Sequence, residues 1–216
     1  MLLNDERRQL VDYGKRMQAD NLTVGTSGNI SIRSGDLIAI TPSGAAYDEL
    51  TPESISVIDL SGRHVDGQLE PSSEVPMHTK VYQHTDAVAV VHTHPLYASA
   101  LSTLLDEIPP VHYMIALLGG PVRVAPYATF GSPELAENSV HAMKDRYGVV
   151  LANHGATTYG ESLSKAYSRS IYLEWVCQMY YQARLLGRPR LLPEDEIDRV
   201  GGKLTTYGQT VEPSTT

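Results

Sequence analysis

Three histidines and one glutamate in this 216-residue chain have the side-chain chemistry of a metal site. His92 and His94 end an apolar run, His154 closes a second such run, and Glu74 lies upstream in a Pro-Ser-Ser-Glu segment. Three neutral imidazoles with an open fourth position are the ligand set of a catalytic divalent metal, whereas a closed structural site would contain cysteines. The residue types therefore predict a catalytic metal centre.

The local sequence around each ligand supports this interpretation. Residues two apart on a strand face the same side, so His92 and His94 could bind one ion, and Gly155 directly after His154 would allow close backbone approach. Glu74 has a second interpretation, as an acidic residue that complements the dipole of the following helix. The remaining histidines are interpreted as surface or core residues satisfied by hydrogen bonds: His64, His78, His84, His112 and His141.

Three loops have the composition of an anion site: residues 25–29, residues 41–44 and the pair Ser72 and Ser73. Glycine lets successive backbone N–H groups converge on an oxyanion, and Ser, Thr and Asn side chains add donors. Each loop alone is also ordinary turn chemistry. Their occurrence together, upstream of the histidine set, favours an anion site beside the metal.

Composition and charge exclude several classes of partner. The net charge is -8 at pH 7 with a pI near 5.4, and Lys and Arg are scattered, which argues against nucleic-acid and membrane partners. Charged residues within the first ten positions are incompatible with the apolar core of a secretory signal, so we expect a cytoplasmic protein. One cysteine, Cys177, cannot form an intramolecular disulfide, and we expect it in the core.

Apolar periodicity, caps and turn residues predict an alternation of helices and strands. Predicted helices cover residues 5–20, 76–83, 133 to about 148, and 163–186, the last with Ser162 as N-cap and Gly187 as its stop. Predicted strands cover residues 30–33, 37–40, 56–60, 87–92, 122–125 and 149–153. We expect one α/β domain over residues 1–208, with a mostly antiparallel sheet covered by helices, and a polar, disordered tail over residues 209–216.

Several segments resemble one known family when they are taken together. They are GTSGNIS at 25–31, ITPSG at 40–44, PSSE at 71–74, VVHTH at 90–94, HYMIA at 112–116, APYATFG at 125–131, HG at 154–155 and KLTTYG at 203–208. The set resembles the class II aldolases of the AraD and fuculose phosphate aldolase group over nearly the whole chain. No single segment is specific, but the combination is.

The resemblance implies a three-layer α/β/α fold with a central, mostly antiparallel sheet, and a homotetramer whose active sites lie between subunits. It implies a zinc ion on His92, His94 and His154, with manganese or cobalt as alternatives, and Glu74 as a fourth, displaceable ligand. The phosphate of a sugar phosphate substrate would be held by Gly28, Asn29, Ser43, Gly44, Ser72 and Ser73.

The activity implied by the resemblance is zinc-dependent retro-aldol cleavage of L-fuculose 1-phosphate, or a closely related ketose 1-phosphate, to dihydroxyacetone phosphate and L-lactaldehyde. Glu74 would transfer the proton at the hydroxymethyl carbon, and Tyr113 the proton at the aldehyde oxygen. Phe130, Leu204 and Tyr207 would form the aldehyde pocket, with Tyr113 and Tyr207 reaching into a neighbouring subunit. Leu204 stands where the family has an aromatic residue, so 5-deoxyribulose or methylthioribulose 1-phosphate would also suit this wall.

Three alternative functions share the resemblance. A ribulose 5-phosphate 4-epimerase would carry Asp at position 74 and lack the tyrosine of the HYM segment, and both details favour the aldolase. A methylthioribulose-1-phosphate dehydratase would have a similar metal site. An adducin-like binding module would lack the zinc ligands, so His92, His94, His154 and Glu74 together favour an enzyme.

Overall fold

The computed structural model describes residues 1–207 of the chain. Its strands are β1 (Asn29–Ser34), β2 (Leu37–Ile40), β3 (Ser56–Asp59), β4 (His64–Asp66), β5 (Ala89–Thr93), β6 (Glu107–Ile108), β7 (Val122–Ala125), β8 (Gly148–Leu151) and β9 (Gly155–Gly160). They form one sheet in the order β4-β3-β2-β1-β5-β9-β8-β7-β6. Neighbouring strands are antiparallel except β7 and β8, which are parallel.

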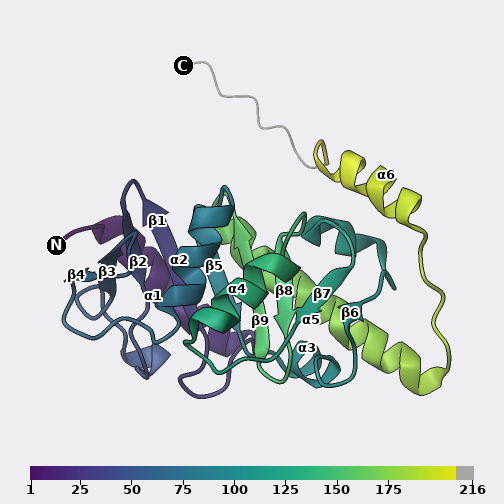
Figure 1. Cartoon of the computed structure of the whole chain (residues 1–216), viewed down its shortest axis with the longest axis horizontal. Helices are drawn as coiled ribbons and strands as arrows, with labels where there is room; N and C mark the ends of the chain where they lie inside the picture. The colour runs from purple at the N-terminus through teal and green to yellow at the C-terminus, as the bar shows by residue number, and fades with distance from the viewer. Residues whose placement is uncertain (208–216) are drawn as a thin grey trace.

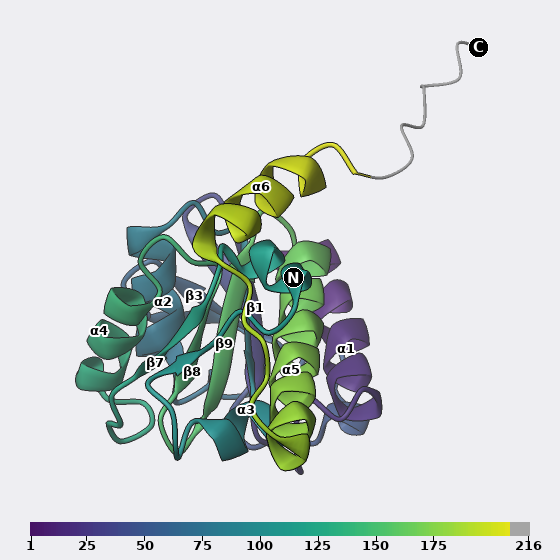
Figure 2. The same cartoon turned by 90° about the vertical axis from the view of Figure 1, so that its right-hand side faces the viewer.

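Helices cover both faces of this sheet (Figures 1 and 2). Their bounds are α1 (Asn4–Ala19), α2 (Val75–His84), α3 (Leu96–Leu101), α4 (Pro133–Ala142), α5 (Leu163–Leu186) and α6 (Glu194–Leu204), with 3-10 turns η1 (Tyr47–Glu49) and η2 (Tyr113–Leu118). Helices α2 and α4 lie together on one face, and α1 and α5 lie on the other. The expected three-layer arrangement around a mostly antiparallel sheet is confirmed.

Successive side chains of the central strands point to opposite faces of the sheet, so each face has its own part of the hydrophobic core. Ile30 and Ile32 of β1 pack with α1 and the start of α5, whereas Val90 of β5 packs with α2 and α4. Ser31 lies between the two isoleucines and points to the α2 side, as the period of two requires. The α2 face of β1 and β5 therefore carries polar residues, and the functional site develops there.

Several sequence predictions agree closely with the structure. The bounds predicted for β2, β7 and α5 are those observed, and the hydroxyl of Ser162 accepts a hydrogen bond from the backbone N–H of Lys165 at 3.2 Å, as expected of an N-cap. Cys177 is buried, and burial raises the pKa of its thiol. It is core, as expected.

Other predictions were wrong or incomplete. The helix predicted to reach about residue 148 ends at Ala142, because Asp145 adopts a left-handed φ of 59° that no α-helix accommodates. Strands β4, β6 and β9 and helices α3 and α6 were not predicted. The polar tail expected at residues 209–216 lies outside the described residues.

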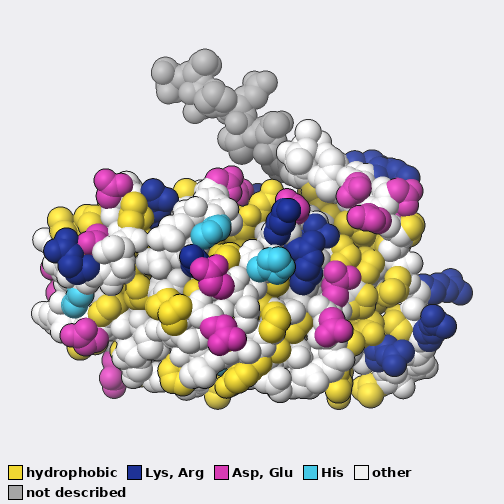
Figure 3. All heavy atoms as spheres, in the orientation of Figure 1, with side chains coloured by type: hydrophobic (Ala, Val, Ile, Leu, Met, Phe, Trp, Pro, Cys, Tyr) yellow, Lys and Arg dark blue, Asp and Glu magenta, His cyan; other side chains and the backbone are white. Residues whose placement is uncertain are grey.

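Charged side chains of both signs are present on the face drawn in Figure 3. Most basic side chains in this view have acidic neighbours, but several basic side chains lie together at the right-hand end, where α5 ends. Within residues 1–207, no helix is long and apolar enough to cross a membrane.

Candidate metal centre

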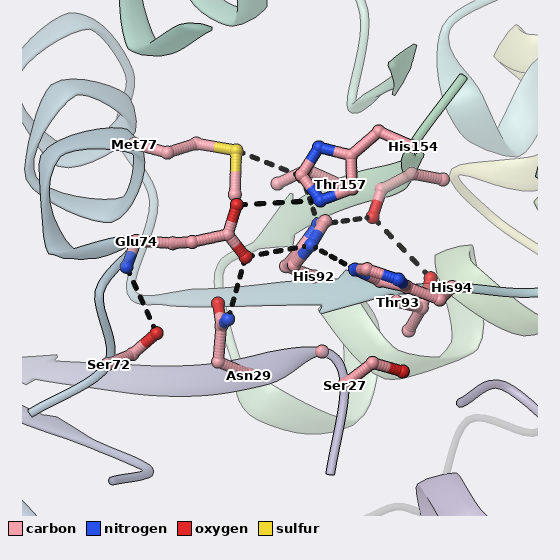
Figure 4. A network of polar contacts seen from close by, with 12 residues as sticks. Ser27, Asn29, Ser72, Glu74, Met77, His92, Thr93, His94, His154 and Thr157 are labelled. Atoms are coloured by element: carbon pink, nitrogen blue, oxygen red, sulfur yellow. Dashed lines mark hydrogen bonds and ion pairs between the residues drawn. The ribbon is translucent and has the colours of Figure 1, made fainter. Parts of the chain in front are cut away.

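Three sheet elements and one helix deliver the four predicted ligands to one place (Figure 4). His92 lies in β5, His94 directly follows that strand, His154 occupies the turn between β8 and β9, and Glu74 immediately precedes α2. One ligand atom from each residue lies within 4.8 Å of the others. Ligand atoms bound to a single ion at about 2.0–2.2 Å are separated by roughly 3–4 Å, so the cluster has the compactness that one cation requires.

Local backbone geometry explains how the strands deliver these side chains. Asn153 has a left-handed φ of 54°, which turns the chain between β8 and β9 and presents His154. Gly155 has no room for a side chain, because a Cβ there would overlap the carbonyl oxygen of Thr93. The close approach expected from this glycine is confirmed, and it brings His154 next to the end of β5.

Hydrogen bonds fix the tautomer of His92. Its Nδ1 lies 3.0 Å from the carbonyl oxygen of Ala156, which can only accept, so Nδ1 carries the proton. The unprotonated Nε2 then faces Oε2 of Glu74 at 2.9 Å and Nε2 of His94 at 2.9 Å. A backbone acceptor on one nitrogen and a bare second nitrogen are typical of a metal-ligating histidine.

The charges in the cluster also fit a cation. Burial lowers the pKa of His94 to about 3 and that of His154 to about 4, so both imidazoles are neutral at pH 7. Burial alone would raise the pKa of the Glu74 carboxyl, but its interaction with the His92 imidazole and a hydrogen bond from Asn29 outweigh burial and hold the pKa below its usual range. An ionised carboxylate thus lies among nitrogen lone pairs.

One oxygen of Glu74 is left without a hydrogen bond. Among the described residues, Oε1 of Glu74 is buried and has no hydrogen-bond partner, and it lies 3.6 Å from Nε2 of His154. A buried, unsatisfied carboxylate oxygen costs free energy unless another group binds it. The donor set, three nitrogens and one free carboxylate oxygen, fits a zinc-like divalent ion.

The predicted anion loops lie beside the cluster. A pocket of about 280 Å³ is lined by all six predicted phosphate-binding residues together with Glu74, His94, His154 and Phe130. Gly28 and Gly44 adopt left-handed φ values of 77° and 65°, which present backbone N–H groups in a way that other residues rarely adopt. Thr26, Ser27 and Pro42 of the predicted anion loops also line the pocket, whereas the lining residues Tyr127, Ala128 and Asn153 were missed by the sequence analysis.

Asn29 has a different place from the one expected of a phosphate ligand. Its side chain is buried, donates to Oε2 of Glu74 at 2.9 Å and accepts from His78 at 2.5 Å. Its carbonyl oxygen and one of its two amide hydrogens are therefore engaged inside the protein, although Asn29 also lines the pocket. Its cross-strand pairing with His92 in the sheet register could not be read from the sequence.

Three predicted residues lie away from the pocket of their own chain. Tyr113 begins η2 and is 47% exposed, and Tyr207, the last described residue, is 85% exposed. Leu204 ends α6 and packs against the apolar cluster that contains Ile197 and Val176. None of these three residues lines the pocket that contains Glu74, His94 and His154 of the same chain.

Most of the other histidines are satisfied by hydrogen bonds, as predicted. His64 pairs with the carbonyl of Asp66, His84 with that of Lys80, and the Nδ1 of His112 accepts from the N–H of Met114. His78 is fully buried and bonded at both ring nitrogens.

The three-layer fold holds a cluster of four residues that could bind one metal ion beside a pocket. The family described as "Class II Aldolase and Adducin N-terminal domain" matches residues 8–181, and the chain belongs to this family. Its named relatives are aldolases, so the protein is a lyase.

Two relatives and one solved structure show how far the similarity extends. The chain is 43% identical to a 5-deoxy-D-ribulose 1-phosphate aldolase of Bacillus thuringiensis serovar kurstaki, over 97% of this chain and 100% of the relative. It is 40% identical to the L-fuculose phosphate aldolase of Escherichia coli strain K12, over 97% of this chain and 98% of the relative. A solved L-fuculose 1-phosphate aldolase superposes with a TM-score of 0.92 at 39% identity, covering 95% of this chain and 98% of that one.

Proposed function

We propose that the protein is a zinc-dependent aldolase that cleaves a short deoxyketose 1-phosphate to dihydroxyacetone phosphate and a small aldehyde. The observation that carries the proposal is the position of the cluster of Glu74, His92, His94 and His154 beside three glycine- and serine-rich loops that line the same pocket. A phosphate on the loops would place a three-carbon fragment next to the cluster. This is the arrangement that cleavage of a 1-phosphate needs.

Each residue has a distinct task in this proposal. His92, His94, His154 and Glu74 would hold the ion, which when bound supplies a Lewis acid for the negative charge that develops on the three-carbon fragment. Glu74 would carry a proton to and from the hydroxymethyl carbon, and Tyr113 would exchange one with the aldehyde oxygen. The loops bind the phosphate away from the reacting bond and orient the substrate.

Two substrates are the leading candidates. L-fuculose 1-phosphate, which gives L-lactaldehyde, is supported by the fuculose phosphate aldolase motifs and by the solved structure of similar fold. 5-Deoxyribulose 1-phosphate, which gives acetaldehyde, is supported by the 43% identity to an aldolase named for it. Both share the phosphate and the ketone, so the aldehyde pocket with Phe130, Leu204 and Tyr207 would decide between them.

We further propose a single domain over residues 1–208 that assembles into a cytoplasmic homotetramer. The exposure of Tyr113 and Tyr207, away from the pocket of their own chain, supports active sites shared between neighbours. Mixing inactive His94→Ala subunits with inactive Tyr113→Phe subunits tests this, because a mixed oligomer would contain some sites with both groups intact. Recovery of activity on mixing supports shared sites, and no recovery in mixed oligomers refutes them.

The proposed activity is tested by a coupled assay for dihydroxyacetone phosphate. The substrates are the 1-phosphates of L-fuculose, L-rhamnulose and 5-deoxyribulose, with ribulose 5-phosphate as the control that would expose an epimerase. His94→Ala should lose metal and activity together, whereas His84→Ala, an exposed histidine of α2, should retain both. Failure of metal-loaded protein to release dihydroxyacetone phosphate from any 1-phosphate would overturn the proposal.

A further inference from the structure

A chain of hydrogen bonds between buried polar residues ends on Glu74. The hydroxyl of Tyr82 lies 2.7 Å from Oγ of Ser31, and that oxygen lies 2.7 Å from Nδ1 of His78. Nε2 of His78 lies 2.5 Å from Oδ1 of Asn29, whose amide nitrogen donates to Oε2 of Glu74 at 2.9 Å. All five residues are buried, and His78 and Ser31 are fully buried.

The periods of one helix and one strand build this chain. Glu74, His78 and Tyr82 are four residues apart at and within α2, so they share one face of the helix. Asn29 and Ser31 are two apart in β1 and share the face of the sheet that α2 covers. The two polar rows interdigitate in the interior, where an unpaired polar group would be costly.

The direction of every hydrogen bond follows from its two ends. A carboxylate oxygen only accepts, so the amide group of Asn29 that faces Glu74 is its NH2, and its carbonyl oxygen faces His78. Nε2 of His78 must then carry a hydrogen. Burial lowers the pKa of His78 to about 3, so the ring is neutral and its bare Nδ1 accepts from Ser31. In each hydrogen bond of the chain, the donor is therefore the residue nearer to Tyr82 and the acceptor is the residue nearer to Glu74.

We propose that His78 is a positioning residue which, by fixing the amide of Asn29, holds the carboxylate of Glu74 in the orientation that exchanges the substrate proton. The amide nitrogen of Asn29 and Nε2 of His92 both lie 2.9 Å from Oε2 of Glu74, so this side of the carboxylate is held between β1 and β5. Without a donor on His78, the amide of Asn29 loses the contact that sets which of its two ends faces Glu74.

This inference rests on the proposed aldolase function. In the synthetic direction the C–H bond of the hydroxymethyl carbon of dihydroxyacetone phosphate breaks, its electron pair stays on the three-carbon fragment, and the proton forms an O–H bond with the carboxylate of Glu74. In cleavage the same proton returns from Glu74 to carbon. No other reactant is needed, and His78 itself gains and loses no proton.

The test compares His78→Gln with His78→Asn. The glutamine amide nitrogen can occupy the place of Nε2 and donate to Asn29, whereas asparagine is one methylene shorter and reaches only the Nδ1 position. The measurement is the exchange of the hydroxymethyl hydrogens of dihydroxyacetone phosphate with deuterium from solvent, alongside metal content and affinity for that phosphate. His84→Asn, an exposed change on the same helix, is the matched control.

We expect His78→Asn to slow the exchange roughly 10- to 100-fold, while metal content and phosphate affinity stay within about threefold of the unsubstituted protein. His78→Gln should restore most of the rate, and His84→Asn should not change it. Equal exchange rates in the Asn and Gln variants would overturn the proposal. So would a loss of metal and phosphate binding in proportion to the loss of exchange, because that pattern indicates a packing role.

A second measurement does not depend on any variant. The 15N shifts of the imidazoles in the metal-free protein report the tautomer, and we expect His78 to carry its hydrogen on Nε2. A hydrogen on Nδ1 would reverse the direction of the chain and overturn the proposal. If the unsubstituted, metal-loaded protein cleaves no ketose 1-phosphate, the proposed function fails instead, which the tautomer measurement distinguishes.

Discussion

Replacing Gly155 by alanine should damage the metal centre without touching a ligand. Gly155 does not have a positive φ, so alanine can adopt its backbone conformation without strain. The expected loss of metal affinity and stability therefore comes from the steric overlap of the added Cβ with its neighbours. The added Cβ would overlap the carbonyl oxygen of Thr93 and lie 3.2 Å from Cδ2 of His94. The overlap would push β5 and β9 apart, and these two strands carry or flank all three histidines.

The size of the effect can be worked from this geometry. An ordinary C···O contact of about 3.3 Å requires β5 and β9 to separate by about 1 Å. Metal sites tolerate ligand displacements of roughly 0.2 Å, so even half of this separation exceeds the tolerance. We expect the metal affinity to fall at least about 10-fold and the free energy of unfolding of the metal-free protein to fall by about 1–3 kcal/mol, as for other overpacked cores.

The assay is a metal titration against a competing chelator, with urea unfolding of the metal-free protein. Gly201→Ala is the control, because a Cβ at Gly201 in α6 meets nothing within 4 Å and alanine should stabilise that helix by about 0.5–1 kcal/mol. If Gly155→Ala binds metal as tightly as the unsubstituted protein, the argument that the close approach of these strands sets the ligand geometry is wrong.

Three other predictions follow from the site. Glu74→Gln should abolish deuterium exchange at the hydroxymethyl carbon of dihydroxyacetone phosphate while binding of that phosphate persists; normal exchange would remove Glu74 from its role. Tyr113→Phe should slow cleavage roughly 100-fold or more with metal content unchanged, and an unchanged rate would mean that another acid serves the aldehyde oxygen. Acid should destabilise the metal-free protein as pH falls from 6.5 toward 3, because the unfolded state binds a proton that buried His78, with its pKa lowered to about 3, does not. The loss from this residue is about 2 kcal/mol at pH 5, and urea unfolding of His78→Gln, which lacks this titration, should show a correspondingly shallower pH dependence.

The elements that were predicted from the sequence are those whose signals are local. Helix α5 has buried positions spaced three and four apart from Leu163 to Cys177, a serine that caps its start and a glycine at its end. Strand β2 and strand β7 are short apolar runs between turn residues. For such segments, neighbouring residues contain the information that decides the structure.

Two of the elements that were missed, α3 and β9, depend on distant partners. The N-terminus of α3 is capped by Glu174 of α5, which accepts from the backbone N–H groups of Tyr97 and Ala98 at 2.8 Å each. Strand β9, with the sequence GATTYG, has no apolar alternation, and it is buried because Thr158 bonds within the interior to the carbonyl of Ala166 and to Ser170. No local pattern predicts a cap or a hydroxyl partner that lies in another element.

By itself the sequence determined the kinds of groups at the site: two histidines with a spacing of two at a strand end, a third histidine before a glycine, and a carboxylate ahead of a proline-started helix. The tertiary structure alone decided how they meet, because sheet register sets Asn29 opposite His92 and packing of α2 on β1 aligns His78 with Asn29. Periodicity specifies which face a residue occupies, but only the pairing of distant strands specifies what that face meets.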